Sequence, residues 1–277
     1  MSKEEILHQD PKEIAKYIIS HTPIGLLDSS LENLKVLIKE NILKSPEINK
    51  EIIAYKENHL IPIEIQKEKT NEKIKVIASP YNKDNEDFYY DQIQKIRFKL
   101  NDKYEPENIE EFLISTEMFR KISRRMEGYV DKYYNGKALH YNVYHNELLN
   151  KIHILISGQL INNKNFWAGE WISIWCLDIG EKTMDGEIKI NTIYYEEGNF
   201  QFNFKKNYEQ KIKSSDESDM ADEFIGFIEK NENDVQNKIE EINKNISQEY
   251  IQSLRKSIPI IEKKMNWTLD QMHFKQA

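Results

Sequence analysis

Apolar residues in the N-terminal part of the chain recur at the three- and four-residue spacing of helices. One stripe begins at Ile14 and a second at Leu31. Pro23 lies between them, where proline and a nearby glycine oppose helix continuation, and Pro46 begins a third stretch at a position that suits a first helical turn. The pattern therefore predicts three short antiparallel helices that form a stalk over residues 1–58.

The spacing then changes to alternation between apolar and polar residues, which is typical of half-buried strands. Alternation runs over residues 61–66, 74–76 and 96–100, and it predicts a small β region over residues 59–106. Within this region, the acidic and asparagine-rich stretch from Asn82 to Asp91 is predicted to be a long exposed loop.

The middle of the chain, residues 107–213, combines a helix with the most strand-like stretch of the sequence. Residues 107–134 return to helical spacing. Five strand candidates follow, namely Lys137–His145, Lys151–Leu160, Ala168–Leu177, Glu187–Glu196 and Phe200–Lys206. Their connections are short, and Glu196–Asn199 suits a hairpin turn, so the five strands are predicted to form an antiparallel meander.

One apolar stripe from Phe224 to Leu254 predicts a single long helix over residues 214–258, which Pro259 ends or kinks. At about 1.5 Å per residue, such a helix is long enough to span a whole sheet. Residues 259–277 form a separate tail. The predicted fold class is therefore α+β, with a helical stalk, a small β region, a five-stranded antiparallel sheet crossed by a long helix, and an amphipathic tail.

The composition bears on the compartment in which the protein works and on the kinds of site that it can form. The chain has 277 residues, 39 basic and 47 acidic, and a formal net charge of −8. Cys176 is the single cysteine, so the chain can form neither an internal disulfide nor a multi-cysteine zinc site. The N-terminus lacks the apolar stretch of a signal peptide, and no apolar run approaches the roughly 18 residues that cross a bilayer. These features predict a cytoplasmic protein with no transmembrane segment.

Candidate catalytic and metal-binding residues are few. His140 and His145 point to opposite faces of one predicted strand, and no carboxylate lies at a matching ligand spacing, so a metal site at these residues and His153 is not favoured. Cys176 lies in an apolar strand with no adjacent base, as a structural thiol does. Nine glycines leave no glycine-rich phosphate loop. We therefore expect neither an enzyme nor a cofactor.

Two tryptophans mark the most apolar of the predicted strands. Trp171 and Trp175 share one face of this strand, and Ile172 and Ile174 lie on the other, so both faces must be covered. Tryptophans can also stack on nucleic-acid bases, but the surrounding charge is not basic, and core packing is the favoured interpretation. Nucleic acid is not an expected partner.

The tail has one apolar helical face with positive charge beside it. Its apolar residues recur at helical spacing, Trp267 flanks them, and lysines add charge; the residues concerned are Ile261, Lys263, Lys264, Met265, Leu269, Met272 and Lys275. Such a tail can fold back as a core element, bind a membrane surface or dock in a groove of a partner. Because a helix this short is marginal in water alone, ordering on binding is favoured.

Four motifs, in order, resemble one known family. They are Lys16-Tyr-Ile-Ile-Ser-His-Thr-Pro-Ile-Gly25, Asn165-Phe-Trp-Ala-Gly-Glu-Trp171 with Trp175, Tyr194-Tyr-Glu-Glu-Gly-Asn199, and Ile251-Gln-Ser-Leu-Arg-Lys-Ser-Ile-Pro259 followed by Trp267. The third resembles an aromatic pair before Glu-Asp-Gly-Asn, and the fourth resembles Phe-Lys-Ala-Leu-Arg-Arg-x-Leu-Pro. Together they resemble the F-actin-capping protein alpha subunit from about residue 12 to the end.

The resemblance implies a cytoskeletal protein that blocks subunit addition and loss at the barbed end of an actin filament. It implies a dimer in which two five-stranded sheets join, either with a beta subunit or with a second copy of the chain. Actin contacts are implied for a basic patch and the apolar tail, at Arg255, Lys256, Lys263, Lys264, Trp267, Leu269 and Met272. Phosphoinositide binding is also implied, although Gln252 and Glu262 stand where the family pattern is basic.

The charge distribution agrees with this placement of the contact. Residues 214–250 carry a net charge of −8, whereas residues 251–277 carry +3. The positive charge is therefore concentrated where the resemblance places the acidic partner. The alternative interpretation is a dimeric scaffold or adaptor of the same fold, whose tail binds another protein or a membrane surface.

Overall fold

The computed structural model describes residues 10–67, 72–113, 116–134, 139–162, 164, 166–194 and 200–245. The chain divides into two compact units, Met1–Glu229 and Lys230–Ala277. Among the described residues, the first unit contains every strand and most of the helices, and the second contains the C-terminal half of the last helix.

The N-terminal helices are α2 (Pro11–His21), α3 (Leu27–Leu37), α4 (Glu40–Leu43) and α5 (Pro46–Asn58). The predicted break around Pro23 is confirmed, and so is the start of a helix at Pro46. The structure adds the one-turn helix α4, which is too short to leave a periodic signal. The helices bury a common apolar core made of Ala15, Ile19, Leu27, Leu34, Ile38, Ile48 and Tyr55.

The predicted small β region consists of two sheets. Strands β1 (Ile63–Gln66) and β2 (Lys73–Val76) form an antiparallel pair. Strands β3 (Tyr89–Asp91), β4 (Ile96–Leu100) and β5 (Pro106–Glu111) form the second sheet. Alternate residues of β1, β2 and β4 point into one shared core, as the alternation predicted.

The prediction of an exposed loop from Asn82 to Asp91 holds for the exposed turn at residues 85–87 and is wrong for both ends of the stretch. A 3₁₀ turn, η1 (Pro80–Asn82), and strand β3 lie in this stretch, and both of its end residues are buried. The Asn82 amide donates to the backbone oxygens of Ile77 (2.8 Å) and Tyr90 (2.9 Å), so its polarity serves internal hydrogen bonds. Polar composition alone does not distinguish such a buried polar residue from an exposed one.

The predicted helix over residues 107–134 begins ten residues later than expected, and its first part is wrong. Residues 106–111 form β5 instead, which pairs with β4. Helix α6 (Glu117–Tyr133) then begins after Thr116, whose hydroxyl accepts a hydrogen bond from the backbone N–H of Phe119 at 3.2 Å. This cap fixes the helix start more strongly than the apolar spacing does.

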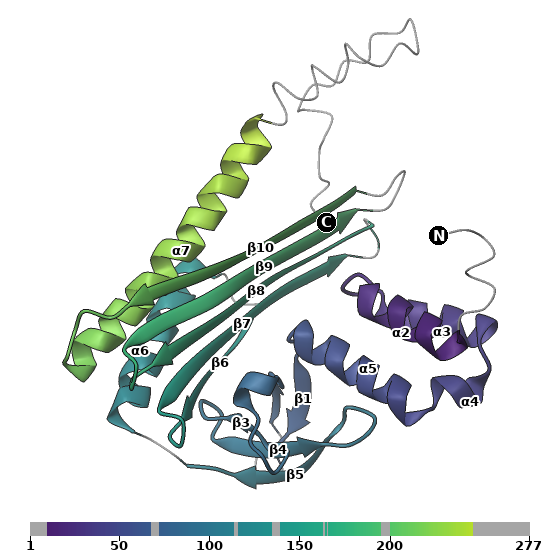
Figure 1. Ribbon diagram of the computed structural model, residues 1–277, viewed down its shortest axis with the longest axis horizontal. Helices are drawn as coiled ribbons and strands as arrows, with labels where there is room; N and C mark the ends of the chain where they lie inside the picture. Colours follow the sequence, from purple (N-terminus) through teal and green to yellow (C-terminus); the bar gives the residue numbers. More distant parts are fainter. Residues whose placement is uncertain are drawn as a thin grey trace, which may run out of the picture. The chain divides into compact units, whose positions relative to one another are not determined.

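The predicted five-stranded antiparallel meander is confirmed (Figure 1). Its strands, in the order β10-β9-β8-β7-β6, are β6 (Leu139–Asn146), β7 (Lys151–Asn162), β8 (Trp167–Asp178), β9 (Thr183–Tyr194) and β10 (Phe200–Lys211). Most are longer than predicted. The β9–β10 pairing brings Tyr194 opposite Phe200, while the predicted turn at Glu196–Asn199 lies outside the described residues.

Both faces of the large sheet are covered around the tryptophan strand, as predicted. On one face, Trp175 is fully buried and meets Phe227 of helix α7 (Glu217–Asn245) edge-on, with ring centroids 5.5 Å apart. On the other face, Ile172 and Ile174 pack with Leu60, Ile77 and Leu155. Core packing therefore explains this strand.

The predicted long helix is present as α7, which begins at Glu217 and is described as far as Asn245. Its expected continuation to residue 258 and the whole predicted tail, residues 259–277, lie outside the described residues. No helix in the described ranges combines the length and the apolarity that a bilayer span requires.

Candidate interaction surface

The residues that the resemblance assigns to actin binding lie together near the C-terminus. All seven, from Arg255 to Met272, fall outside the described residues, and so do Gln252 and Glu262. Their assignment therefore stays a prediction, and the surfaces that the structure describes are those of the sheet and the helices of the first unit.

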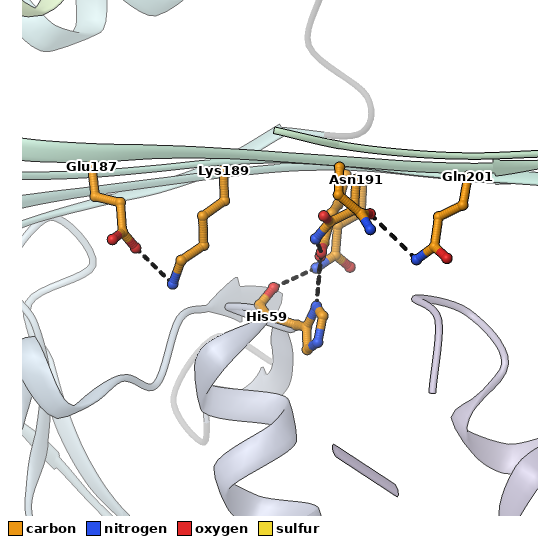
Figure 2. Close-up of polar contacts among 8 residues, drawn as sticks. His59, Glu187, Lys189, Asn191 and Gln201 are labelled. Atoms are coloured by element: carbon orange, nitrogen blue, oxygen red, sulfur yellow. Dashed lines mark hydrogen bonds and ion pairs between the residues drawn. The ribbon is translucent and has the colours of Figure 1, made fainter. Parts of the chain in front are cut away.

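A buried carboxylate joins the sheet to the N-terminal helices. The Glu170 side chain, on β8, is fully buried, and His59 Nδ1 lies 2.8 Å and 2.9 Å from its two oxygens. Asn191, on β9, donates its amide to the same carboxylate (Figure 2). Gln159, on β7, donates to the backbone oxygen of His59 at 2.7 Å. Strands β7 and β8 therefore hold the end of α5 through hydrogen bonds, and β9 holds the Glu170 carboxylate in place.

Polar side chains continue along this face onto β9 and β10, and Figure 2 shows Glu187 paired with Lys189. Glu187 lies 2.7 Å from Lys189 on its own strand and 2.6 Å from Lys205 on β10. Burial opposes ionisation of Glu187, but the hydrogen bonds and positive charge of the two lysines lower its pKa below the usual range. This part of the face is therefore polar, in contrast to the apolar part under Ile172.

A cavity of about 470 Å³ opens on this face between Tyr81 and strands β8 to β10. Its walls include Cys176, Asp185 and Glu209, which lie in one row across three neighbouring strands. Burial raises the pKa of the Cys176 thiol to about 12, so this thiol is protonated at neutral pH. The Asp185 carboxylate, which forms a hydrogen bond with this thiol, also favours its protonated form, so the thiol is a poor nucleophile. This agrees with the structural role predicted for Cys176, but the prediction that no base lies beside it is wrong.

His153 continues this row onto β7, opposite Cys176. Its Nδ1 atom is buried and has no hydrogen-bond partner among the described residues, and its ring lies 5.6 Å from that of Tyr81. Burial lowers the pKa of His153 to about 4. Across the described ranges, no three His, Cys, Asp or Glu side chains are placed so that they can hold a metal ion.

The low pKa of His153 predicts a loss of stability in acid. In the unfolded chain, His153 has a pKa near 6.5 and becomes protonated below that pH, whereas in the folded chain it stays neutral down to about pH 4. The free energy of unfolding therefore falls as the pH drops from about 6.5 toward 4. From pH 7 to pH 5, we expect the wild type to lose about 2 kcal/mol more than a His153→Gln variant. Urea unfolding of both proteins at the two pH values measures this difference.

Asp91 also titrates in this pH range, but it does not affect the difference between the wild type and the His153→Gln variant. Burial raises its pKa to about 6, so it stabilises the fold as the pH falls, opposite to His153. Because Asp91 is present in both proteins, its contribution cancels in the difference. Identical pH dependence in the two proteins would contradict the account of His153.

The two edges of the large sheet differ. At the β6 edge, the Gln92 side chain forms two hydrogen bonds with the backbone of His145. It accepts one from the His145 N–H at 2.9 Å and donates one to the His145 carbonyl oxygen at 3.0 Å. At the other edge, β10 pairs only with β9 among the described residues, along all twelve positions from Phe200 to Lys211. A strand of this length with one free side is a template for pairing with another chain.

The sequence alone identified neither the Glu170 contact nor this difference between edges. Glu170 had one usable signal, since the one charge in the interior of the apolar strand Trp167–Asp178 needs a buried partner. Its partner His59 lies 111 residues away, which no local pattern can reveal.

Comparisons with known proteins agree with the sequence and the fold. A family model described as F-actin capping protein alpha subunit matches residues 15–276. The F-actin-capping protein subunit alpha of Caenorhabditis elegans is 25% identical over 283 residues, which cover 97% of each chain. That of Saccharomyces cerevisiae is also 25% identical, and the match covers 92% of this chain and 91% of the yeast protein.

A solved structure is also similar, that of the homodimeric actin capping protein alpha subunit from Plasmodium berghei. It matches with a TM-score of 0.67 and 23% identity over 91% of this chain and 98% of that one. At this identity the likeness concerns the fold, and it agrees with the five-stranded sheet and its helices. Because the family model matches nearly the whole sequence, this chain belongs to the F-actin-capping protein alpha subunit family.

Proposed function

We propose that this protein is a subunit of a dimeric cap that binds the barbed end of actin filaments and blocks addition and loss of actin subunits. The observation that carries the proposal is the family match from residue 15 to residue 276, which includes the tail. The family consists of structural capping proteins and is not an enzyme family. Capping would take place by steric occlusion, and the protein would be associated with the cytoskeleton.

The β10 edge is the surface that we propose for dimerisation. It is long and, within the described part of the chain, pairs on one side only, whereas at the β6 edge Gln92 bonds to the backbone of His145. Pairing along β10 would extend the sheet to ten strands and remove an edge that otherwise promotes aggregation. The partner is a capping protein beta subunit or a second copy of this chain; the similar Plasmodium protein is a homodimer.

We propose that actin contacts are made by the basic and apolar residues of the C-terminal segment. Arg255 and Lys256 would meet acidic actin surface first, with Lys263 and Lys264 beside them. Trp267, Leu269 and Met272 would then bury apolar area in a groove. Phosphoinositides would compete for the same positive charge, and Gln252 and Glu262 would weaken both interactions.

Seeded filament elongation tests this assignment. The wild-type dimer is expected to stop barbed-end growth at substoichiometric concentration, and an Arg255→Ala/Lys256→Ala variant is expected to associate about tenfold more slowly, because two steering charges are lost. A Lys39→Ala/Lys50→Ala variant, which removes two exposed lysines from the N-terminal helices, serves as the charge-matched control.

Two outcomes would contradict the assignment. Equal association by the wild type and the Arg255→Ala/Lys256→Ala variant would remove the basic anchor from the account. No barbed-end effect, together with tail-dependent binding to vesicles or another protein, would favour the scaffold or adaptor instead.

A further inference from the structure

Helix α6 holds a concentration of arginine that the rest of the chain lacks. The sequence has 34 lysines but only five arginines, and three of the five, Arg120, Arg124 and Arg125, lie within six residues of each other. Arginine differs from lysine in its planar fork, which binds carboxylates through two parallel hydrogen bonds. In a chain that uses lysine for most positive charge, this cluster points to recognition of a carboxylate.

One of the three arginines has a partner within the fold. Arg125 forms an ion pair with Asp222 on α7, with a nitrogen–oxygen distance of 2.5 Å. The neighbouring Lys121 forms another with Glu117 on α6, at 3.1 Å. Arg120 and Arg124 are exposed, and within the described ranges no carboxylate lies within ion-pair distance of either. Two guanidinium groups therefore face outward with their hydrogen-bonding capacity available.

The spacing of these two arginines places them on one face. Residues four apart lie about one helical turn from each other, roughly 6 Å between their Cβ atoms. The opposite face of α6 is buried through Met118, Phe119, Ile122, Met126 and Tyr129, so it fixes the orientation of the helix. The arginine pair is therefore held in position by a packed helix and not by a loop.

The next turn of the same face has no side chain. Gly128 follows Arg124 by four residues, and a Cβ atom built there meets nothing within 4 Å. Gly226 on α7 is equally open. The pairs Arg125–Asp222 and Lys132–Glu229 join residues 97 apart, so α6 and α7 run side by side and the two glycines lie at about the same level. A partner backbone can therefore approach closely beside the guanidinium pair.

We propose that Arg120 and Arg124 form a second anchor for an acidic protein surface, which binds carboxylates of the filament end beside the bare backbone at Gly128. This inference rests on the proposed capping function and adds a contact outside the C-terminal segment. A membrane is the less suitable partner, because lipid recognition uses clusters of about four to eight cations.

The experiment compares three double variants of the full-length dimer with the wild type. Arg120→Gln/Arg124→Gln removes the charges, Arg120→Lys/Arg124→Lys keeps them but removes the fork, and Lys39→Gln/Lys50→Gln is the charge-matched control on the N-terminal helices. The readout is the association rate constant for barbed ends in seeded elongation, at about 50 mM and about 200 mM salt. Thermal unfolding confirms that each variant is folded.

We expect the glutamine variant to associate about fivefold more slowly at low salt and to show a weaker salt dependence. The lysine variant should recover part of the rate, and the control should match the wild type. If the wild type caps and the glutamine variant caps equally fast at both salt concentrations, this inference is overturned while the proposed function stands. If the wild type does not cap, both fail. Loss of phosphoinositide-vesicle binding with unchanged capping would also overturn it, by assigning the pair to a lipid headgroup.

Discussion

Replacing His59 by alanine is expected to lower the free energy of unfolding by about 3 kcal/mol, because it removes one of the two described hydrogen-bond partners of the buried Glu170 carboxylate. The Glu170 side chain is fully buried, and both of its oxygens lie within hydrogen-bond distance of His59 Nδ1. Only the Asn191 amide would remain as a described donor to it. Urea denaturation of the wild type and the variant at pH 7 measures the change.

Two further variants separate the cost of leaving the Glu170 charge buried from the cost of removing the His59 ring. His59→Ala/Glu170→Gln removes the charge as well, so it should recover a substantial part of the loss, since a neutral amide costs less to bury than a carboxylate. His21→Ala, at the exposed end of α2, should change stability by less than about 1 kcal/mol. A change below about 1 kcal/mol for His59→Ala itself would show that the buried contact does not stabilise the fold.

Proline at an outward-facing position of the edge strand β10 is expected to weaken dimerisation strongly without unfolding the subunit. Along β10, successive backbone N–H groups point alternately toward β9 and away from it, so of the two variants Phe202→Pro and Asn203→Pro, one removes an outward N–H. We expect that variant to keep the stability of the subunit and to weaken dimerisation at least about 100-fold. The other variant should lower stability as well.

Sedimentation of the protein alone and with a beta subunit provides the readout. A matched substitution at the opposite edge, Tyr141→Pro in β6, should leave dimerisation of folded protein unchanged, because Gln92 and Asn142 already link that edge to Tyr90 and its neighbours. Dimers of normal affinity from both β10 variants would contradict pairing along β10.

Local periodicity predicted the large sheet well. Alternation is strong where one face packs against helices and the other is polar, as in β9, whose residues Ile188 and Ile190 are buried between Glu187, Lys189 and Asn191. The ends of the strands were predicted too short because they extend beyond the apolar core, where only backbone pairing with the next strand determines how far they run.

The failures have a common physical cause, namely polar residues whose partners are distant in sequence. Asn82 and Asp91 looked like loop residues because nothing local shows that Asn82 satisfies the backbone of Ile77 and Tyr90. The Glu170–His59 contact joins residues 111 apart. The arginine cluster of α6 was visible as composition, but which arginines are free became clear only from the pairing of Arg125 with Asp222.

The most direct test of the central claim is microscopy of single growing actin filaments whose two ends are distinguished. The account predicts that nanomolar dimer stops growth at the barbed end while the pointed end of the same filament continues to elongate. Barbed ends that keep their growth rate at saturating protein, both for the chain alone and for its complex with a beta subunit, would contradict the capping function.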